Sequence, residues 1–139
     1  MLGAFPARRL AILSAFLVSV CVADWAVKWC RPLLWSGWVP HPAERPWMLL
    51  IPLSVSALVL LWAIDDRLMT AALGVAAGGM YANVIDVNVD GVAWNMIPVP
   101  FTNGVWCNVA DVAIAAGVAC AVAAFVRWFL REWRSPAAG

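Results

Sequence analysis

The chain has 139 residues, of which 65% are hydrophobic and only 12% are charged, and its formal net charge is +1. A typical soluble domain is about 45–50% apolar and about 25% charged, and a fold of this size has too little interior to bury so much apolar surface. The composition therefore excludes a soluble domain, a disordered chain and a basic nucleic-acid binder. It predicts an integral membrane protein that is surrounded by the lipid bilayer and has no nucleic acid as a partner.

Four apolar stretches are each long enough to cross a hydrocarbon core of about 30 Å as a helix. In chain order they cover residues 10–29, 47–64, 68–85 and 109–130. Only a short polar turn separates the second stretch from the third, so these two are expected to form an antiparallel hairpin. The predicted fold class is an all-α membrane protein: one domain over residues 1–139, built as a bundle of four transmembrane helices with two longer loops.

The positions of the positive charges predict the orientation of this bundle, because cytoplasmic loops carry an excess of Lys and Arg. With four spans, six arginines fall on one side of the membrane and two on the other. The six are Arg8, Arg9, Arg67, Arg127, Arg131 and Arg134, and the two are Arg31 and Arg45. Both termini are therefore expected in the cytoplasm and both longer loops outside, where the first loop could also contain a small β element.

Most of the ten tryptophans lie near the predicted ends of spans. At the outer ends they are Trp25, Trp29, Trp35, Trp38, Trp47, Trp94 and Trp106, and at the inner end of the last span they are Trp128 and Trp133. Aromatic belts at the two membrane interfaces explain this distribution. A stacking site for a sugar or a nucleobase is the alternative, but nothing in the sequence positions one.

The cysteines and the single histidine predict no metal site. No CxxC pair occurs, and His41 is the only histidine. Cys21 and Cys120 lie inside apolar runs, where a thiol behaves as a small hydrophobic group. Cys30 and Cys107 flank spans on the predicted outer side, so a disulfide between them and two free thiols are both open.

Six polar residues lie near the predicted outer ends of three spans, where ionisable and amide groups are costly. They are Asp24, Lys28, Asn83, Asp86, Asn108 and Asp111. The i, i+4 spacing of Asp24 and Lys28 favours an ion pair on one helix face. Asn108 and Asp111 fit the N-cap and the first turn of the last helix. We expect the six side chains at one membrane level, facing a shared interior either as a functional site or as a structural network.

Three of these segments also match the motifs of a known family. Residues 108–114, Asn-Val-Ala-Asp-Val-Ala-Ile, with Gly117 after them, are similar to the block F-N-x-A-D-x-x-I-x-x-G. Residues 83–86 match the start of an N-x-x-D-R block, and residues 24–28 match D-x-x-x-K. In order and spacing along nearly the whole chain, the sequence resembles signal peptidase II, the lipoprotein signal peptidase, which is a four-span aspartic membrane peptidase.

The resemblance implies an endopeptidase that removes signal peptides from diacylglyceryl-modified prolipoproteins in a bacterial-type plasma (inner) membrane, with no metal or organic cofactor. Asp111 matches one catalytic aspartate of the family. The second is expected nine residues after Asp86, where this chain has Asn95. An amide cannot exchange a proton as a carboxyl does, so the family's dyad is incomplete, and Asp90 is the candidate substitute. The family gives Asp86 a supporting, hydrogen-bonding role.

Two further departures concern the substrate. Val87 stands where the family has arginine, and residues 31–46 lack the N-x-G-x-A-F segment that helps to cradle the lipid-modified substrate in the family. Two functions stay open: a working peptidase, and a non-catalytic pseudopeptidase that acts as a membrane scaffold or as an accessory subunit of a larger membrane complex. A small transporter or channel subunit is a weaker third reading, because the sequence contains no visible duplication.

Overall fold

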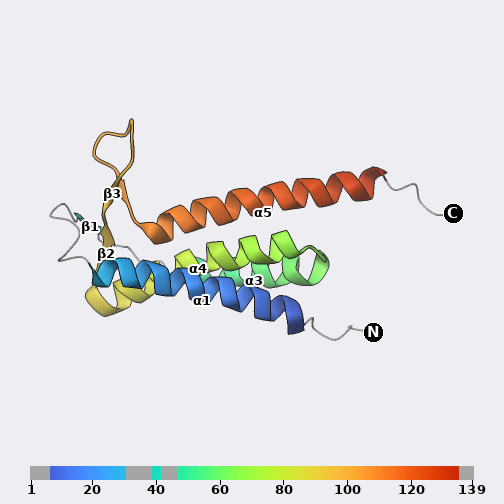
Figure 1. Ribbon diagram of the computed structural model, residues 1–139, viewed down its shortest axis with the longest axis horizontal. Helices are drawn as coiled ribbons and strands as arrows, with labels where there is room; N and C mark the ends of the chain where they lie inside the picture. Colours follow the sequence, from blue (N-terminus) through green and yellow to red (C-terminus); the bar gives the residue numbers. More distant parts are fainter. Residues whose placement is uncertain (1–6, 31–38, 42–46, 135–139) are drawn as a thin grey trace.

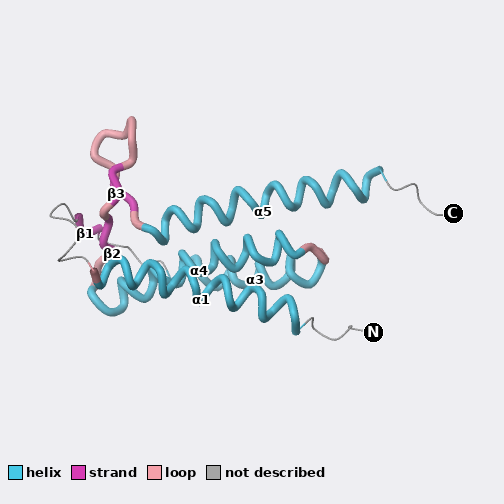
Figure 2. Tube along the Cα trace, viewed as in Figure 1, coloured by secondary structure: helices cyan, strands magenta, loops and turns pink. Residues whose placement is uncertain are grey.

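The computed structural model describes residues 7–30, 39–41 and 47–134, which form four helices and four short strands (Figure 1). The helices are α1 (Ala7–Trp29), α3 (Trp47–Ala63), α4 (Arg67–Asp90) and α5 (Val109–Arg134). The strands are β1 (Val39–His41), β2 (Ala93–Asn95), β3 (Ile97–Pro98) and β4 (Trp106–Cys107). The helices run along one long axis, with the strands at one end and the start of α1 and the end of α5 at the other (Figure 2).

The described helices have the length and composition of membrane helices. Three of them, α1, α4 and α5, are long and apolar enough to cross a membrane. The fourth, α3, has 17 residues, which corresponds to about 26 Å at about 1.5 Å per residue. The predicted starts at residues 47 and 109 coincide with the first residues of α3 and α5. The predicted all-α membrane class is therefore confirmed.

The helix that contains the third predicted span extends beyond residue 85, where that span was expected to end. The helix α4 continues through Asp90 and stops at Gly91, which has φ +76°. Glycine adopts this left-handed conformation without a steric penalty, which makes it a common helix terminator. Asp86 is buried in this helix, and its carboxylate pairs with Lys28 of α1, which compensates the cost of burying the charge. That partner lies far away in the sequence, so the local pattern could not reveal it.

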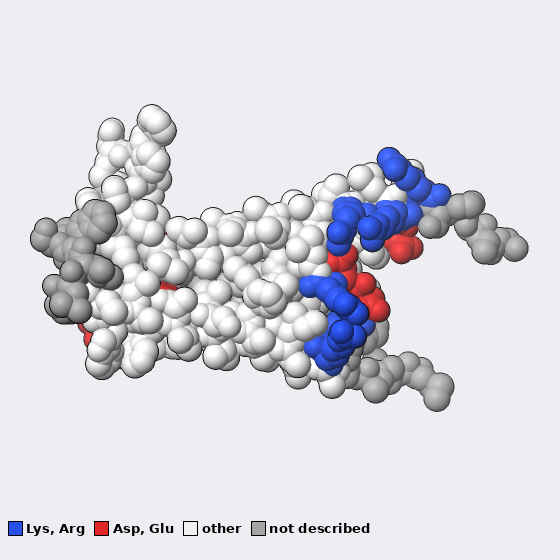
Figure 3. Space-filling model, in the orientation of Figure 1, with Lys and Arg blue, Asp and Glu red and all other residues white. Residues whose placement is uncertain are grey.

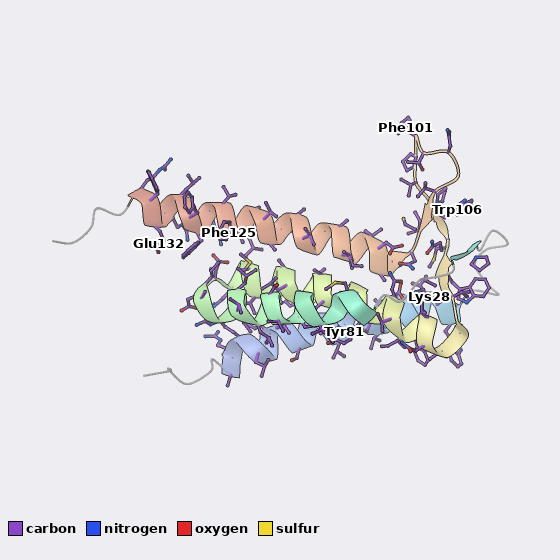
Figure 4. The ribbon with its side chains drawn as sticks, turned by 180° about the vertical axis from the view of Figure 1, so that it is seen from behind. Lys28, Tyr81, Phe101, Trp106, Phe125 and Glu132 are labelled. Carbon is purple, nitrogen blue, oxygen red and sulfur yellow. The ribbon has the colours of Figure 1, made fainter. Side chains whose placement is uncertain are left out.

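The strands join the two long loops at one end of the bundle. β1, in the first loop, pairs antiparallel with β2, in the second, so that Val39 lies opposite Asn95. β3 and β4 form another antiparallel pair with Ile97 opposite Cys107, and their connecting loop projects from the helices with Phe101 at its far end (Figure 4). A small β element in the first loop was expected, but its partner strand was not. The predictions for the rest of that loop lie outside the described residues; they concern 31–38 and 42–46, with Arg31, Arg45, Trp35 and Trp38.

Glycines allow α1 to approach α4 closely. Gly74 and Gly78 lie one turn apart on α4 and face α1. A Cβ atom added at these positions would lie 2.6 Å from the Leu13 carbonyl oxygen and 2.7 Å from the Leu17 carbonyl oxygen, respectively. Small residues at such spacing are a common means of packing helices in membranes.

Gly117 allows α5 to pack equally closely against α4. A Cβ atom here would lie 2.5 Å from the backbone nitrogen of Ala76. We expect Gly117→Val to lower the free energy of unfolding by about 1–3 kcal/mol, because the two backbones must separate. Thermal unfolding in detergent micelles, followed by circular dichroism, measures this change. Ala119→Val, on the exposed side of the same helix, is the control, and an equal loss in both variants would contradict close packing at Gly117.

Charged side chains gather at the end of the bundle opposite the strands (Figure 3). Arg9 of α1 donates from Nη1 to the carbonyl oxygens of Leu61 at 2.8 Å and Ile64 at 3.1 Å, at the end of α3. Its Nε atom also lies 3.3 Å from Oδ1 of Asp65. The arginine thereby satisfies carbonyl groups that a helix C-terminus leaves without partners.

Asp66 ties the start of α4 to α5 at this end. Its Oδ1 atom accepts a hydrogen bond from the Met69 N–H at 3.0 Å, and its Oδ2 atom pairs with Arg127. Burial alone would raise the pKa of Asp66, but the hydrogen bonds from Met69 and Arg127 outweigh burial and hold this pKa below its ordinary value. A depressed carboxyl pKa stabilises the fold above the unfolded pKa of about 3.9 and ceases to do so as the pH falls through the folded value.

Asp66→Asn should therefore destabilise the protein at neutral pH, and this difference should disappear as the pH falls through the folded pKa of Asp66. The amide keeps the helix cap but loses the charge that faces Arg127. We expect a loss of about 0.5–1 kcal/mol at pH 7, since the arginine is partly exposed. Thermal unfolding of both proteins between pH 2.5 and 7 tests this, and a difference independent of pH would rule out the charge as its source.

Candidate functional site

A buried ion triad joins α1 to α4 near the strand end of the bundle. Lys28 and Asp24 of α1 and Asp86 of α4 have side chains that are 7%, 1% and 8% exposed. The Lys28 ammonium lies 2.5 Å from Asp24 Oδ2 and also contacts Asp86 Oδ2. The predicted i, i+4 pair is confirmed, and the structure adds a second carboxylate to it. Two carboxylates around one ammonium leave each buried charge with a partner.

The triad extends to the first turn of α5 through a backbone group. Asp24 Oδ1 accepts a hydrogen bond from the Ala110 N–H at 2.9 Å. That N–H is one of the donors at a helix N-terminus that have no partner within the helix. Asp24 therefore connects α1 to α5 as well as to Lys28. Sequence reasoning missed this contact, because a backbone donor has no residue-specific signal.

A network of amides lies beside the triad. Asn83 of α4 donates from Nδ2 to Asp111 Oδ1 at 2.8 Å. Asn108 donates from Nδ2 to Asn83 Oδ1 at 2.8 Å and to Asn95 Oδ1 at 3.1 Å. Asn95 in turn donates from its own Nδ2 to the Trp106 carbonyl oxygen at 3.0 Å. Asn108 is thus the centre of a continuous path from Asp111 to β4.

Asn108 and Asp111 also cap α5. The Asn108 Oδ1 atom accepts from the Asp111 N–H at 2.8 Å, and Asp111 Oδ2 accepts from the Asn108 N–H at 3.1 Å. This reciprocal arrangement is a capping box. The local interpretation as a helix cap is therefore confirmed, and the same two side chains also belong to the wider network.

The two ends of the Asn95 amide meet groups of opposite polarity. Its oxygen faces a donor, Asn108 Nδ2, and its nitrogen faces an acceptor, the Trp106 carbonyl oxygen. An ionised carboxylate has no proton to donate to a carbonyl. The environment of Asn95, which is buried, therefore suits an amide or a protonated acid at this position.

The structure brings most of the candidate residues together and leaves one apart. Those in the two linked clusters are Asp24, Lys28, Asn83, Asp86, Asn95, Asn108 and Asp111. Asp90 is exposed at the last residue of α4 and lines a cavity with Lys28 and Asp86, on the α1 side. It has no hydrogen bond to Asp111 or Asn95 among the contacts of the described residues.

The cysteines are free thiols. Of the two alternatives for Cys30 and Cys107, the structure therefore has the unpaired form. Burial raises the pKa of the Cys107 thiol, and the nearby Asp111 carboxylate raises it further. No group of three His, Cys, Asp or Glu side chains lies close enough to hold a metal ion within the described part of the chain.

Fold and site together define a small helical membrane protein with a buried network of acids and amides at one end. The family described as Signal peptidase (SPase) II matches residues 33–127, so the chain belongs to the signal peptidase II family.

Two solved structures share its fold, each described as a bacterial membrane enzyme studied by the in meso method. The first, at 2.3 Å resolution, has a TM-score of 0.70 and 13% identity, covering 97% of this chain and 94% of that one. The second, at 1.9 Å, has a TM-score of 0.68 and 14% identity, covering 87% and 94%. No curated protein sequence matches the chain.

Proposed function

We propose that this protein is a pseudopeptidase of the signal peptidase II family, which keeps the family's fold but does not hydrolyse peptides. The observation that carries the proposal is Asn95, whose amide bonds to Asn108 on one side and to the Trp106 carbonyl oxygen on the other. An aspartic peptidase needs two carboxyl groups that share a proton, one acting as base and the other as acid. In this proposal Asp111 has lost the partner that supplies the acid.

The surroundings of Asp111 support the same conclusion. Its two carboxylate oxygens accept hydrogen bonds from Asn83 Nδ2 and from the Asn108 N–H. Neither donor can release a proton to a leaving group at neutral pH. The candidate substitute, Asp90, lines a cavity on the α1 side instead. The network then holds α1, α4 and α5 together. The protein itself is a membrane scaffold or an accessory subunit of a larger complex, and it binds lipid-modified prolipoproteins without cleaving them.

The charge distribution supports a proposed arrangement in the membrane. We infer one domain of four spans, α1, α3, α4 and α5, in a bacterial-type plasma (inner) membrane. The end that holds Arg9, Arg67 and Arg127 would face the cytoplasm under the positive-inside rule, and the strand end would face outward. The aromatic belts proposed for the tryptophans fit this orientation.

Cleavage of a diacylglyceryl-modified prolipoprotein by the purified protein tests the proposal. We expect no cleavage by the native chain or by Asp111→Asn, together with retention of the lipid-modified substrate on the immobilised protein. Cleavage by the native chain that disappears in Asp111→Asn would overturn the proposal and establish a working peptidase. Asp90→Asn would then show whether Asp90 supplies the second carboxyl.

A further inference from the structure

A cavity of about 290 Å³ opens between α1 and α4, on the other side of β2 from Asp111. Neighbouring residues of a strand point to opposite faces. In β2, Asn95 therefore faces Asn108, to which it bonds, whereas Trp94 faces the other way and lines this cavity. The other residues around it are Trp25, Lys28, Trp29, Ile85, Asp86, Val89 and Asp90. The cavity is thus separate from the amide network, and nothing in the proposed function uses it.

A second cavity continues from the first toward the middle of the bundle. Its volume is about 220 Å³, and it shares Trp25, Ile85 and Asp86 with the first. Its remaining lining includes Val22 of α1 and Ala82 of α4, each about one helical turn further from the strands. The pair of cavities therefore has a polar outer part and a mainly apolar inner part, as a site for an amphiphilic molecule requires.

The charges around the cavities favour a cation. Among the described residues, three carboxylates line them, those of Asp24, Asp86 and Asp90, and Lys28 is the one basic side chain. Lys28 contacts Asp24 and Asp86, and Asp90 stands at the exposed rim. An excess of negative charge next to apolar surface attracts cations more strongly than it would in water, because the interaction is screened less. A positively charged group bound at the rim would offset it.

The aromatic rings indicate which kind of cation fits. The rings of Trp25 and Trp29 have centroids 5.0 Å apart at an angle of 58°, and both side chains are more than half exposed. Together with Trp94 they line the same cavity as Asp90. Indole faces attract ammonium groups, whereas inorganic cations such as Mg²⁺ prefer a shell of oxygen ligands. The cavity is therefore suited to an organic ammonium group.

We propose that this pair of cavities binds a membrane lipid with an ammonium head group. The ammonium lies against Asp90 and the indole rings, and one acyl chain follows the apolar cavity along Val22 and Ala82. A lipid supplies both parts from the bilayer that surrounds the helices. The site would be occupied whether or not the protein cleaves peptides.

Native mass spectrometry of delipidated protein, titrated with lipids of identical acyl chains, tests this assignment. We expect phosphatidylethanolamine to bind about fivefold or more tightly than phosphatidylglycerol, which lacks the ammonium. Asp90→Asn and Trp29→Leu should each abolish most of this preference. Both side chains are exposed, so both variants should fold, which circular dichroism verifies.

Two matched variants at the opposite end of the bundle are the controls. Asp65→Asn removes a carboxylate that is 85% exposed, and Trp133→Leu removes a ring that is 78% exposed. Both should keep the preference for phosphatidylethanolamine. Equal binding of the two lipids by the native chain would overturn the proposal, as would an equal loss in the control variants. Displacement of the lipid by free ethanolamine at similar concentrations would assign the site to a soluble amine instead.

Discussion

Replacing Lys28 by methionine is expected to lower the free energy of unfolding by about 3–5 kcal/mol. The substitution keeps much of the side-chain volume but removes the ammonium that contacts Asp24 and Asp86. Both carboxylates are at least nine-tenths buried, so each would lose its charged partner without gaining access to water. Thermal or denaturant unfolding in micelles measures the loss.

Two comparisons separate the triad from a general effect of losing a positive charge. Arg134→Met, at the exposed end of α5, should change stability by less than about 0.5 kcal/mol. Lys28→Met should also cost less in an Asp86→Asn background, because only one buried carboxylate then lacks a partner. A loss below about 1 kcal/mol in the native background would contradict a charged triad.

Restoring a carboxyl at position 95 is expected to produce cleavage of a diacylglyceryl-modified prolipoprotein. In Asn95→Asp, one oxygen can still accept from Asn108 Nδ2, and the other would face the Trp106 carbonyl oxygen, where the amide nitrogen lies 3.0 Å away. Only a protonated oxygen can donate to that carbonyl. The new carboxyl would therefore hold a proton, while the oxygens of Asp111 accept hydrogen bonds, as an acid and base pair requires.

Cleavage by Asn95→Asp should exceed the background seen with the native chain by about 10²-fold or more, the usual contribution of a positioned acid or base. Asn88→Asp, the same change at an exposed position of α4, should produce no cleavage. The double variant Asn95→Asp with Asp111→Asn should be inactive. A folded but inactive Asn95→Asp protein would mean that more than one residue of the family's machinery is missing, and Val87, in place of the family's arginine, would be the next position to change.

The sequence by itself determined the features that depend on length and on near neighbours. Runs of about 20 apolar residues are sufficient to predict membrane helices, and the approximate starts of two predicted spans coincide with the first residues of α3 and α5. The i, i+4 pair of Asp24 and Lys28 was also predictable, as were the places of Asn108 at the N-cap and Asp111 in the first turn of α5, because each depends on near neighbours in the sequence. The family motifs were visible for the same reason, since each occupies a short segment.

The tertiary structure alone decided which distant groups meet. The buried carboxylate of Asp86 meets Lys28 of another helix, and the pairing of β1 with β2 joins two loops that are far apart in the chain. Asp24 and Asn95 bond to backbone groups, the Ala110 N–H and the Trp106 carbonyl, which every residue type supplies and no motif can mark. Whether position 95 suits an amide or a carboxyl side chain thus follows from the atoms that the fold places around it.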